Sequence, residues 1–354
     1  MTRGGAAGHL PEDMGLVNKK KLVFHIGVHK TGSTSIQQTL AGNSGLLARH
    51  GILYPKYPAA AANATNHNRL AWEITTGTVD LVKLRSWARS LAQADAHTVI
   101  VSAEDCCKLK DLAFMRCFGE FFEPEIVIYV RRQDAWVGSW YNQNVKWPYV
   151  RELARCTPNE FLGHLRDFHW INYFETAERW AKEVGRDKIR IRVFESGQIE
   201  DPVADLCDIC GVDFVLEKAL QKRANESFPA TQLRILQDIN IMQYTPDVRL
   251  KIIDAVSRIP VTSRDDIYPA PIRRMILDRY AAGNAMVAEH YLGRKDQVLF
   301  REQDIPDSTV YRENALDDEN LYCFARNLID VFRANATQIS ARSDSPPGSP
   351  SSAA

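Results

Sequence analysis

Between residues 21 and 212, short apolar runs alternate with amphipathic helical patterns, and this alternation limits the fold more than any other feature of the sequence. Five apolar runs predict buried strands, at Lys21–Ile26, Gly51–Tyr54, Thr98–Ala103, Glu125–Val130 and Lys188–Phe194. Helical spacing lies between them at Ser35–Leu47, Val79–Leu91, Ala135–Lys146 and Thr176–Val184. Strands joined by helices pair in parallel, and the helices cover both faces of the sheet. The sequence therefore predicts an α/β fold with a three-layer parallel sheet.

After Gly211 the pattern becomes helical, with no strand signal between the helices. Helical periodicity covers Ala230–Met242, Asp247–Ile259, Pro271–Tyr291 and Asp317–Asn335. Because no Pro/Gly/Ser-rich linker precedes these segments, we predict one domain over 21–339, with an α/β core at 21–212 and a helical part at 213–339. Two separate domains are the alternative. Residues 1–20 and 340–354 are predicted to be a flexible N-terminus and a disordered tail.

Charge and hydropathy exclude several classes of protein. The chain has 44 basic and 44 acidic side chains, so its net charge gives no attraction to nucleic acid or to an anionic membrane. No stretch approaches the ~20 apolar residues of a transmembrane helix, and no export signal is recognisable. A cytoplasmic protein is therefore expected. Cys207 and Cys210 form a lone CxxC without the second pair that a zinc site needs, so we expect no metal.

The turn between the first strand and the first helix is the most informative local motif. It reads His25-Ile-Gly-Val-His-Lys-Thr-Gly-Ser-Thr-Ser35. A glycine-bearing turn before a helix directs backbone N–H groups and the helix dipole at one point, where a phosphate or sulfate fits. Lys30 adds a positive charge, and the Thr and Ser side chains add hydroxyl donors.

This turn differs from the phosphate loop of nucleotide triphosphatases, which has the form GxxxxGK[ST]. If Gly27 and Gly32 occupy the two glycine positions, Ser33 stands where the lysine belongs, and the lysine is found inside the loop at Lys30. The lysine and hydroxyl that would serve the terminal phosphates and Mg²⁺ are therefore missing from their places. ATP or GTP hydrolysis is disfavoured.

Residues His29–Thr34 resemble the 5′-phosphosulfate loop of sulfotransferases that use 3′-phosphoadenosine 5′-phosphosulfate. A second match follows the fourth strand, because Arg131 and Ser139 have the spacing at which this family holds the donor's 3′-phosphate. Arginine suits that task, since its planar fork meets phosphate bidentately. The family commonly has a proline where this chain has Gln133. In the helical part, Asn284 and Tyr291–Gly293 resemble the corresponding sequence of intracellular bacterial members of this family.

The resemblance implies a P-loop-like fold and transfer of a sulfuryl group from that donor to a hydroxyl of a sugar, lipid or small metabolite. It implies that Arg131 and Ser139 bind the donor together with the loop residues His29, Lys30, Thr31, Gly32, Ser33, Thr34 and Ser35. Lys30 would stabilise the leaving oxygen. No metal is expected, because a sulfuryl group has less charge than a terminal phosphate.

Two residues are candidates for the base that takes the acceptor proton. The third strand delivers Glu104 to the carboxyl edge of the sheet, where open α/β sheets bind ligands. Glycan-modifying members of the resembled family use a glutamate at a comparable strand end. The alternative for Glu104 is a helix cap or a pair with Lys108. His67, in a polar loop, is the second candidate, as a base or as a contact to substrate.

Two other functions remain open at this point. A nucleotide-dependent kinase would require a Walker-type Gly-Lys-[Ser/Thr], which is absent around Gly32. A nucleotide-binding protein with a degenerate donor site would bind the donor product without turnover. We predict an enzyme, and whether Lys30 and Glu104 face one pocket discriminates it from these alternatives. The sequence does not define the acceptor or the oligomeric state.

Overall fold

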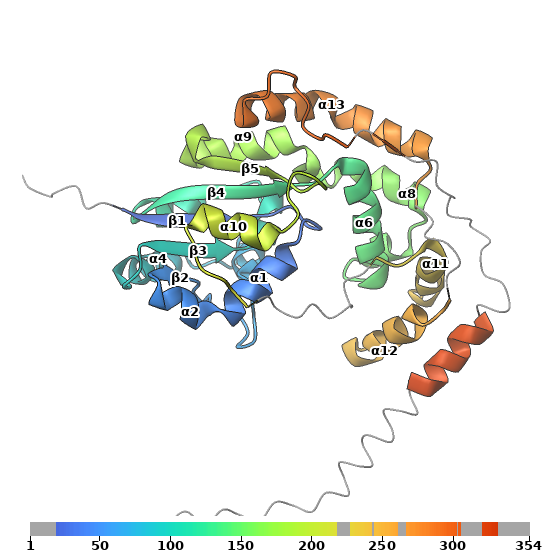
Figure 1. Ribbon diagram of the computed structural model, residues 1–354. Coiled ribbons are helices and arrows are strands. Elements are labelled where there is room, and N and C mark those ends of the chain that lie inside the picture. The colour runs from blue at the N-terminus through green and yellow to red at the C-terminus, as the bar shows by residue number, and fades with distance from the viewer. Residues whose placement is uncertain are drawn as a thin grey trace, which may run out of the picture.

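The fold is built on a five-stranded parallel sheet with helices on both faces (Figure 1). The computed structural model describes residues 19–217, 227–242, 244–260, 267–302, 304–305 and 321–331. The strands are β1 (Lys20–His25), β2 (Ile52–Leu53), β3 (Thr98–Ser102), β4 (Phe122–Val130) and β5 (Ile189–Val193), in the order β2-β3-β1-β4-β5. Every pairing is parallel, which confirms the predicted α/β class and all five strands.

The central position of β1 determines where a ligand can bind. β1 lies between β3 and β4, so the chain leaves β1 toward one edge of the sheet and later returns on its other side. In open α/β sheets, the carboxyl ends of the strands at such a reversal form a crevice. The turn after His25 lies at this crevice, beside the ends of β3 and β4.

Alternate residues of the strands enter two separate hydrophobic cores. On one face, Val23 and Ile100 pack with α1 (Ser33–Gly42), α2 (Ser44–Arg49) and α10 (Pro202–Cys210). On the other face, Leu22 and Phe24 pack with α4 (Leu81–Gln93), α6 (Gln133–Lys146) and α9 (Tyr173–Val184). This period-two division of β1 is the pattern of a strand that is buried on both faces.

The helical part packs on the outside of this sandwich, as predicted. It contains α11 (Ala230–Ile239), α12 (Pro246–Ser257) and α13 (Ala270–Leu292), followed by a further helix at 321–331. α13 lies along α9 and also contacts α6 and the edge strand β5 (Figure 1). α12 is attached to the C-terminal end of α6, because Arg249 donates hydrogen bonds to the carbonyl oxygens of Lys146 and Val145.

The remaining elements are short. They are α3 (Asn68–Thr75), α5 (Arg116–Gly119), α7 (Arg151–Arg155), α8 (Pro158–Gly163) and the 3₁₀ turns at Glu104–Lys108, Ala113–Met115, His164–Arg166, His169–Ile171 and Arg186–Lys188. Among the described helices, none is both long and apolar enough to cross a membrane.

The structure differs from the sequence prediction at Lys20 and over Ser35–Leu47. Lys20, assigned to the flexible N-terminus, pairs with Phe122 as the first residue of β1. The helix predicted over Ser35–Leu47 is two helices, because Asn43 leaves the helical conformation and bonds Thr39 and Glu217 instead. The rest of the predicted N-terminal segment, residues 1–18, and the predicted tail, residues 340–354, lie outside the described residues.

Gln133, where the resembled family commonly has proline, joins α6 to α13. Its side-chain amide exchanges two hydrogen bonds with Asn284, at 2.8 and 3.0 Å. We expect Asn284→Ala to lower the free energy of unfolding by about 1–3 kcal/mol, because a buried amide loses its partner. Urea unfolding of Asn284→Ala, Gln133→Ala and the double variant measures this energy. Additive losses would contradict a coupled pair.

Candidate functional site

The turn after β1 has the backbone conformation of an anion-binding loop. Gly27, Lys30 and Gly32 all have positive φ angles, of 52°, 71° and 85°. Alternation of left- and right-handed residues turns successive N–H groups toward one concave spot. Lys30 is one of two non-glycine residues with positive φ within the described parts of the chain. Its strained backbone is typical of a functional position.

The loop leads into a helix whose N-terminal partial positive charge is not neutralised by an acidic side chain. α1 starts at Ser33 after Gly32, without a side-chain cap and without an acidic residue in its first turn. The Ser35 N–H bonds the Gly32 carbonyl oxygen at 3.0 Å, whereas the first N–H groups of a helix, here those of Ser33 and Thr34, lack an intrahelical acceptor and favour an anion. Gly32 is required here, because a Cβ would lie 2.7 Å from Cγ of Pro202 at the start of α10.

A pocket of about 460 Å³ opens directly over this loop. It is lined by all the predicted site residues except two: His29, Lys30, Gly32, Ser33, Thr34, Ser35, Glu104, Arg131 and Ser139. These side chains come from the β1–α1 loop, from the residues after β3 and from the β4–α6 junction. The ends of three neighbouring strands therefore meet at one cavity.

Lys30 is held in the pocket by contacts with Gln143 and Arg131. Its Nζ lies 3.2 Å from Oε1 of Gln143, and its carbonyl oxygen accepts a hydrogen bond from Arg131 Nη1 at 3.2 Å. Burial, and after it the charge of Arg131, lowers the pKa of the Lys30 amine, whereas Glu104 opposes this shift. Two cations so close together are stabilised when an anion binds between them.

Arg131 has no carboxylate partner among the described residues, unlike its neighbour Arg132. Arg132 forms a bidentate pair with Asp134, and Arg273 bonds the same carboxylate. Within the described residues Arg131 has no ion pair, and burial lowers the pKa of its guanidinium. A largely buried arginine without a counter-ion is costly unless it binds an anion. Ser139, whose hydroxyl has no bond to the described residues, lines the same cavity.

Glu104 does not form the ion pair with Lys108 that the sequence allowed as an alternative. Lys108 pairs with Asp105 instead, at 2.6 Å. The Glu104 carboxylate is partly exposed and forms no hydrogen bond to the described residues. Its negative charge acts to raise the pKa of the Lys30 amine. It therefore remains free to act on a bound molecule.

His29 forms part of the pocket wall. Its Nε2 lies 3.0 Å from Asp105 Oδ1, and its ring packs on Trp140 with centroids 4.8 Å apart. Trp136 Nε1 donates to the His29 carbonyl oxygen at 2.8 Å. Burial would raise the pKa of Asp105, but the hydrogen bonds and charges of His29 and Lys108 outweigh it and lower that pKa. His29 thus holds the loop in place.

Two predicted site residues do not line the pocket. Thr31 is buried and its hydroxyl donates to the Val28 carbonyl oxygen, so it stabilises the turn. His67 is 1% exposed. Its Nε2 donates to the Pro55 carbonyl oxygen at 2.7 Å and its Nδ1 accepts from the Ser102 N–H at 3.1 Å. Burial lowers its pKa. This histidine holds the 55–67 loop against β3.

Other pocket residues had little or no sequence signal. Gln143 lies one helical turn after Ser139, so helical spacing alone would have placed both on one face. Phe194, directly after β5, lies at the same edge of the sheet but has no polar group to mark it, and Ser227 is brought to the pocket only by the tertiary fold. Trp140, Trp147 and Tyr149 belong to the aromatic cluster around α6. They form one wall of the cavity, and Tyr149 is 82% exposed.

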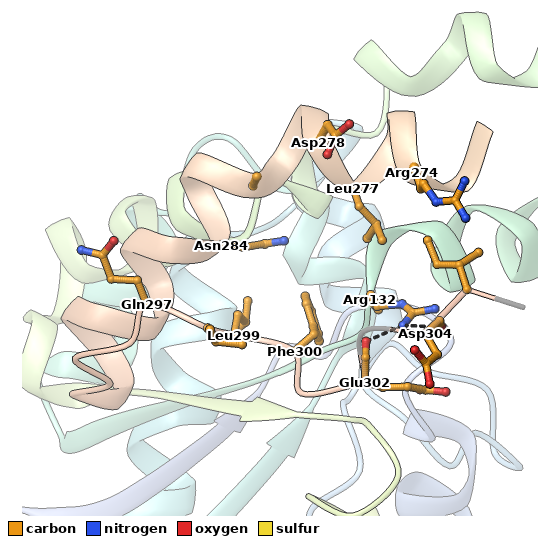
Figure 2. Close-up of a pocket in the computed structure, with 13 residues that line it drawn as sticks. Arg132, Arg274, Leu277, Asp278, Asn284, Gln297, Leu299, Phe300, Glu302 and Asp304 are labelled. Carbon is orange, nitrogen blue, oxygen red and sulfur yellow. Dashed lines mark hydrogen bonds between the residues drawn. The ribbon is translucent and has the colours of Figure 1, made fainter. Parts of the chain in front are cut away.

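A larger cavity, of about 630 Å³, lies between α13 and residues 297–305 (Figure 2). Its buried cation, Arg132, points toward Glu302 and Asp304 and donates to the Glu302 carbonyl oxygen at 2.5 Å. Because Arg132 is also paired with Asp134, this cavity offers no unpaired buried charge. The loop pocket is therefore the better candidate site.

Comparisons with known proteins give distant similarities. No family model matches the chain. An uncharacterized protein of Archaeoglobus fulgidus is 24% identical over 213 residues, which are 58% of this chain and 57% of that protein. A solved structure, a sulfotransferase from Alicyclobacillus acidocaldarius, has a TM-score of 0.37 and 16% identity, over 62% of this chain and 92% of that one. Similarities of this size do not assign a function.

Proposed function

We propose that the protein is a sulfotransferase that uses 3′-phosphoadenosine 5′-phosphosulfate. One observation supports this most strongly: Lys30, Glu104 and Arg131, which follow three separate strands, line one pocket together with Ser139 of α6. A base and unpaired cations in one cavity are the groups that transfer of an anionic group to a hydroxyl requires.

The donor's size and charge fit the surroundings of Arg131. This arginine lines the main pocket and also two adjoining cavities of about 210 and 350 Å³. The 5′-phosphosulfate would bind at the β1–α1 loop and the 3′-phosphate at Arg131 and Ser139. The adjoining cavities provide room for the nucleoside.

The reaction assigns a separate role to each side chain. The acceptor oxygen attacks sulfur, the bond between sulfur and the 5′-phosphate oxygen breaks, and the acceptor proton moves to the Glu104 carboxylate. Charge develops on the leaving oxygen, where Lys30 and the N–H groups at the start of α1 stabilise it. The products are a sulfated acceptor and adenosine 3′,5′-bisphosphate.

The acceptor would approach along the aromatic wall. Trp147 and Tyr149 line the pocket beyond the C-terminal end of α6, and Tyr149 is largely exposed. Exposed aromatic rings stack on sugar rings and on apolar groups alike. The acceptor class therefore stays a hydroxyl of a sugar, a lipid or a small metabolite.

Transfer of label from ³⁵S-donor to a panel of hydroxylated sugars, lipids and phenols tests this function. We expect labelled product without added divalent metal. Label transfer from γ-³²P-ATP instead would favour a phosphoryl transferase. Tight binding of the donor without any turnover, across the panel, would favour a nucleotide-binding protein with a degenerate site.

We expect Arg131→Ala to abolish most of the protein's preference for adenosine 3′,5′-bisphosphate over 5′-AMP. Loss of the contact between Arg131 and the 3′-phosphate costs about 2–5 kcal/mol, because the substitution leaves the charge of the bound phosphate without its partner. Calorimetry with both nucleotides measures the change. Arg85→Ala is the matched control. Arg85 lies on α4, away from the pocket, and forms an exposed ion pair with Glu120. An unchanged preference in Arg131→Ala would refute the role of Arg131.

A further inference from the structure

Two buried polar atoms beneath the loop have no hydrogen-bond partner. They are Nε2 of His25, at the end of β1, and Oγ of Ser33, at the start of α1. His25 is fully buried and Ser33 is 2% exposed, so bulk water does not reach them. Buried polar groups are nearly always bonded, because an unmade bond costs about 1–3 kcal/mol.

Gly27 brings these two atoms to the same place. A Cβ on Gly27 would lie 3.0 Å from Ser33 Oγ, 3.3 Å from His25 Nε2 and 3.2 Å from Cβ of Glu104. Side chains from β1, α1 and the end of β3 therefore converge beside Gly27. The third of them is the residue that we propose as the base.

The other side of the His25 ring is already fixed. Nδ1 lies 2.8 Å from Ser102 Oγ, and the ring packs edge-on against Tyr129. Burial lowers the pKa of His25 to about 3, so the imidazole is neutral at ordinary pH. A neutral, immobilised imidazole offers one directed polar atom, Nε2.

We propose that His25 and Ser33 bind one buried water molecule beside Gly27, and that this water orients the Glu104 carboxylate. Water suits the place, because it donates and accepts and so satisfies Nε2 in either tautomer. With Glu104 as third partner, it has the usual number of bonds for a buried water. His25 is then a positioning residue. This inference rests on the proposed function of Glu104.

The water would also affect the pH dependence of the reaction. A hydrogen bond donated to a carboxylate favours its ionised form, which is the form that acts as base. Lys30, Arg131, His29 and Tyr149 are the other titratable groups that line the pocket. Cys107, on the turn of Glu104, is buried and its raised pKa keeps it neutral. Substitution of His25 leaves all five in place.

Two substitutions of His25 separate positioning from packing. Asparagine can replace the Nδ1 contact to Ser102, whereas glutamine can reach the position of Nε2. We expect His25→Asn to reduce kcat on the order of 10- to 100-fold, as misplaced catalytic groups do. We also expect the acid limb of its kcat–pH profile to move up by ~0.5–1 pH unit. His25→Gln should restore most of both, and donor affinity should stay unchanged in both variants.

The control is His67→Asn, which removes a second buried histidine bonded to the backbone of Ser102, outside the pocket. It should lower Tm without moving the acid limb. Equal losses in His25→Asn and His25→Gln with no shift of that limb would mean that His25 only fills space. Full activity in folded His25→Asn would overturn the inference as well.

A measurement that needs no turnover keeps this test apart from the proposed function. In ¹⁵N NMR spectra of the donor-free protein, the His25 Nε2 resonance should move in Glu104→Gln, because the two groups share one water. The exposed Glu123→Gln should leave it unchanged. If the resonance moves but no sulfuryl transfer is found with the wild-type protein, the linkage stands and the function fails. A resonance insensitive to Glu104→Gln would refute the linkage itself.

Discussion

Glu104→Gln is expected to reduce turnover by about 10²–10⁴-fold, the usual size of a general-base contribution. Glutamine keeps the shape of the side chain but cannot accept the acceptor proton. Glu104 makes no ion pair with Lys108 and no hydrogen bond to the described residues, so its replacement by glutamine breaks neither kind of direct contact with them. Steady-state kinetics with the labelled donor measures the loss.

The alternative role of Glu104, as a helix cap, predicts a different outcome. Loss of a cap costs stability, by about 0.5–2 kcal/mol, and leaves the rate of the folded enzyme nearly unchanged. Tm and donor affinity are therefore measured beside the rate. Glu123→Gln, an exposed carboxylate on β4, is the matched control. A stable, fully active Glu104→Gln protein would eliminate Glu104 as the base.

Lys30→Ala is expected to lower kcat by about 10²–10³-fold, because it removes a charge aimed at the leaving oxygen. Lys30 is largely buried and is flanked by Arg131, so the pocket loses its central cation. Calorimetry and single-turnover kinetics should show a larger loss in rate than in donor affinity.

The backbone of Lys30 calls for a second variant. Its φ of 71° is unfavourable for alanine, so Lys30→Ala could lose activity through a distorted loop. Lys30→Asn tolerates that conformation and still removes the charge. Similar losses in both variants would assign the effect to charge. Near-normal turnover in Lys30→Asn would end the sulfotransferase assignment. Lys83→Ala, a fully solvated lysine of α4, controls for net charge.

The sequence predicts the sheet well because its signals are local. Runs of four to seven largely apolar residues between turn signals mark all five strands, and their spacing requires parallel pairing. The beginning of β4 was missed, because Pro124 is unusual inside a strand. β5 pairs with β4 only from Ile126 onward, so one side of β4 is unpaired at Pro124.

The site was predictable where it follows from strand ends, and not where it depends on packing between distant segments. Lys30, Glu104 and Arg131 each follow a predicted strand, so the parallel sheet brings them to one edge. His67 has the same local chemistry, but α3 and the 55–67 loop bury it against Ser102. Phe194 ends the fifth predicted strand and so lies at the same edge, but it has no polar group or motif to mark it as a pocket residue.

The most direct test of the central claim is calorimetric titration of the wild-type protein with adenosine 3′,5′-bisphosphate, 5′-AMP and Mg-ATP. If Arg131 and Ser139 hold a 3′-phosphate, the bisphosphate should bind at least ~30-fold more tightly than 5′-AMP, which corresponds to about 2 kcal/mol. Its affinity should not depend on Mg²⁺. Equal affinities for the bisphosphate and 5′-AMP, or tight binding of ATP only with Mg²⁺, would contradict the proposed function.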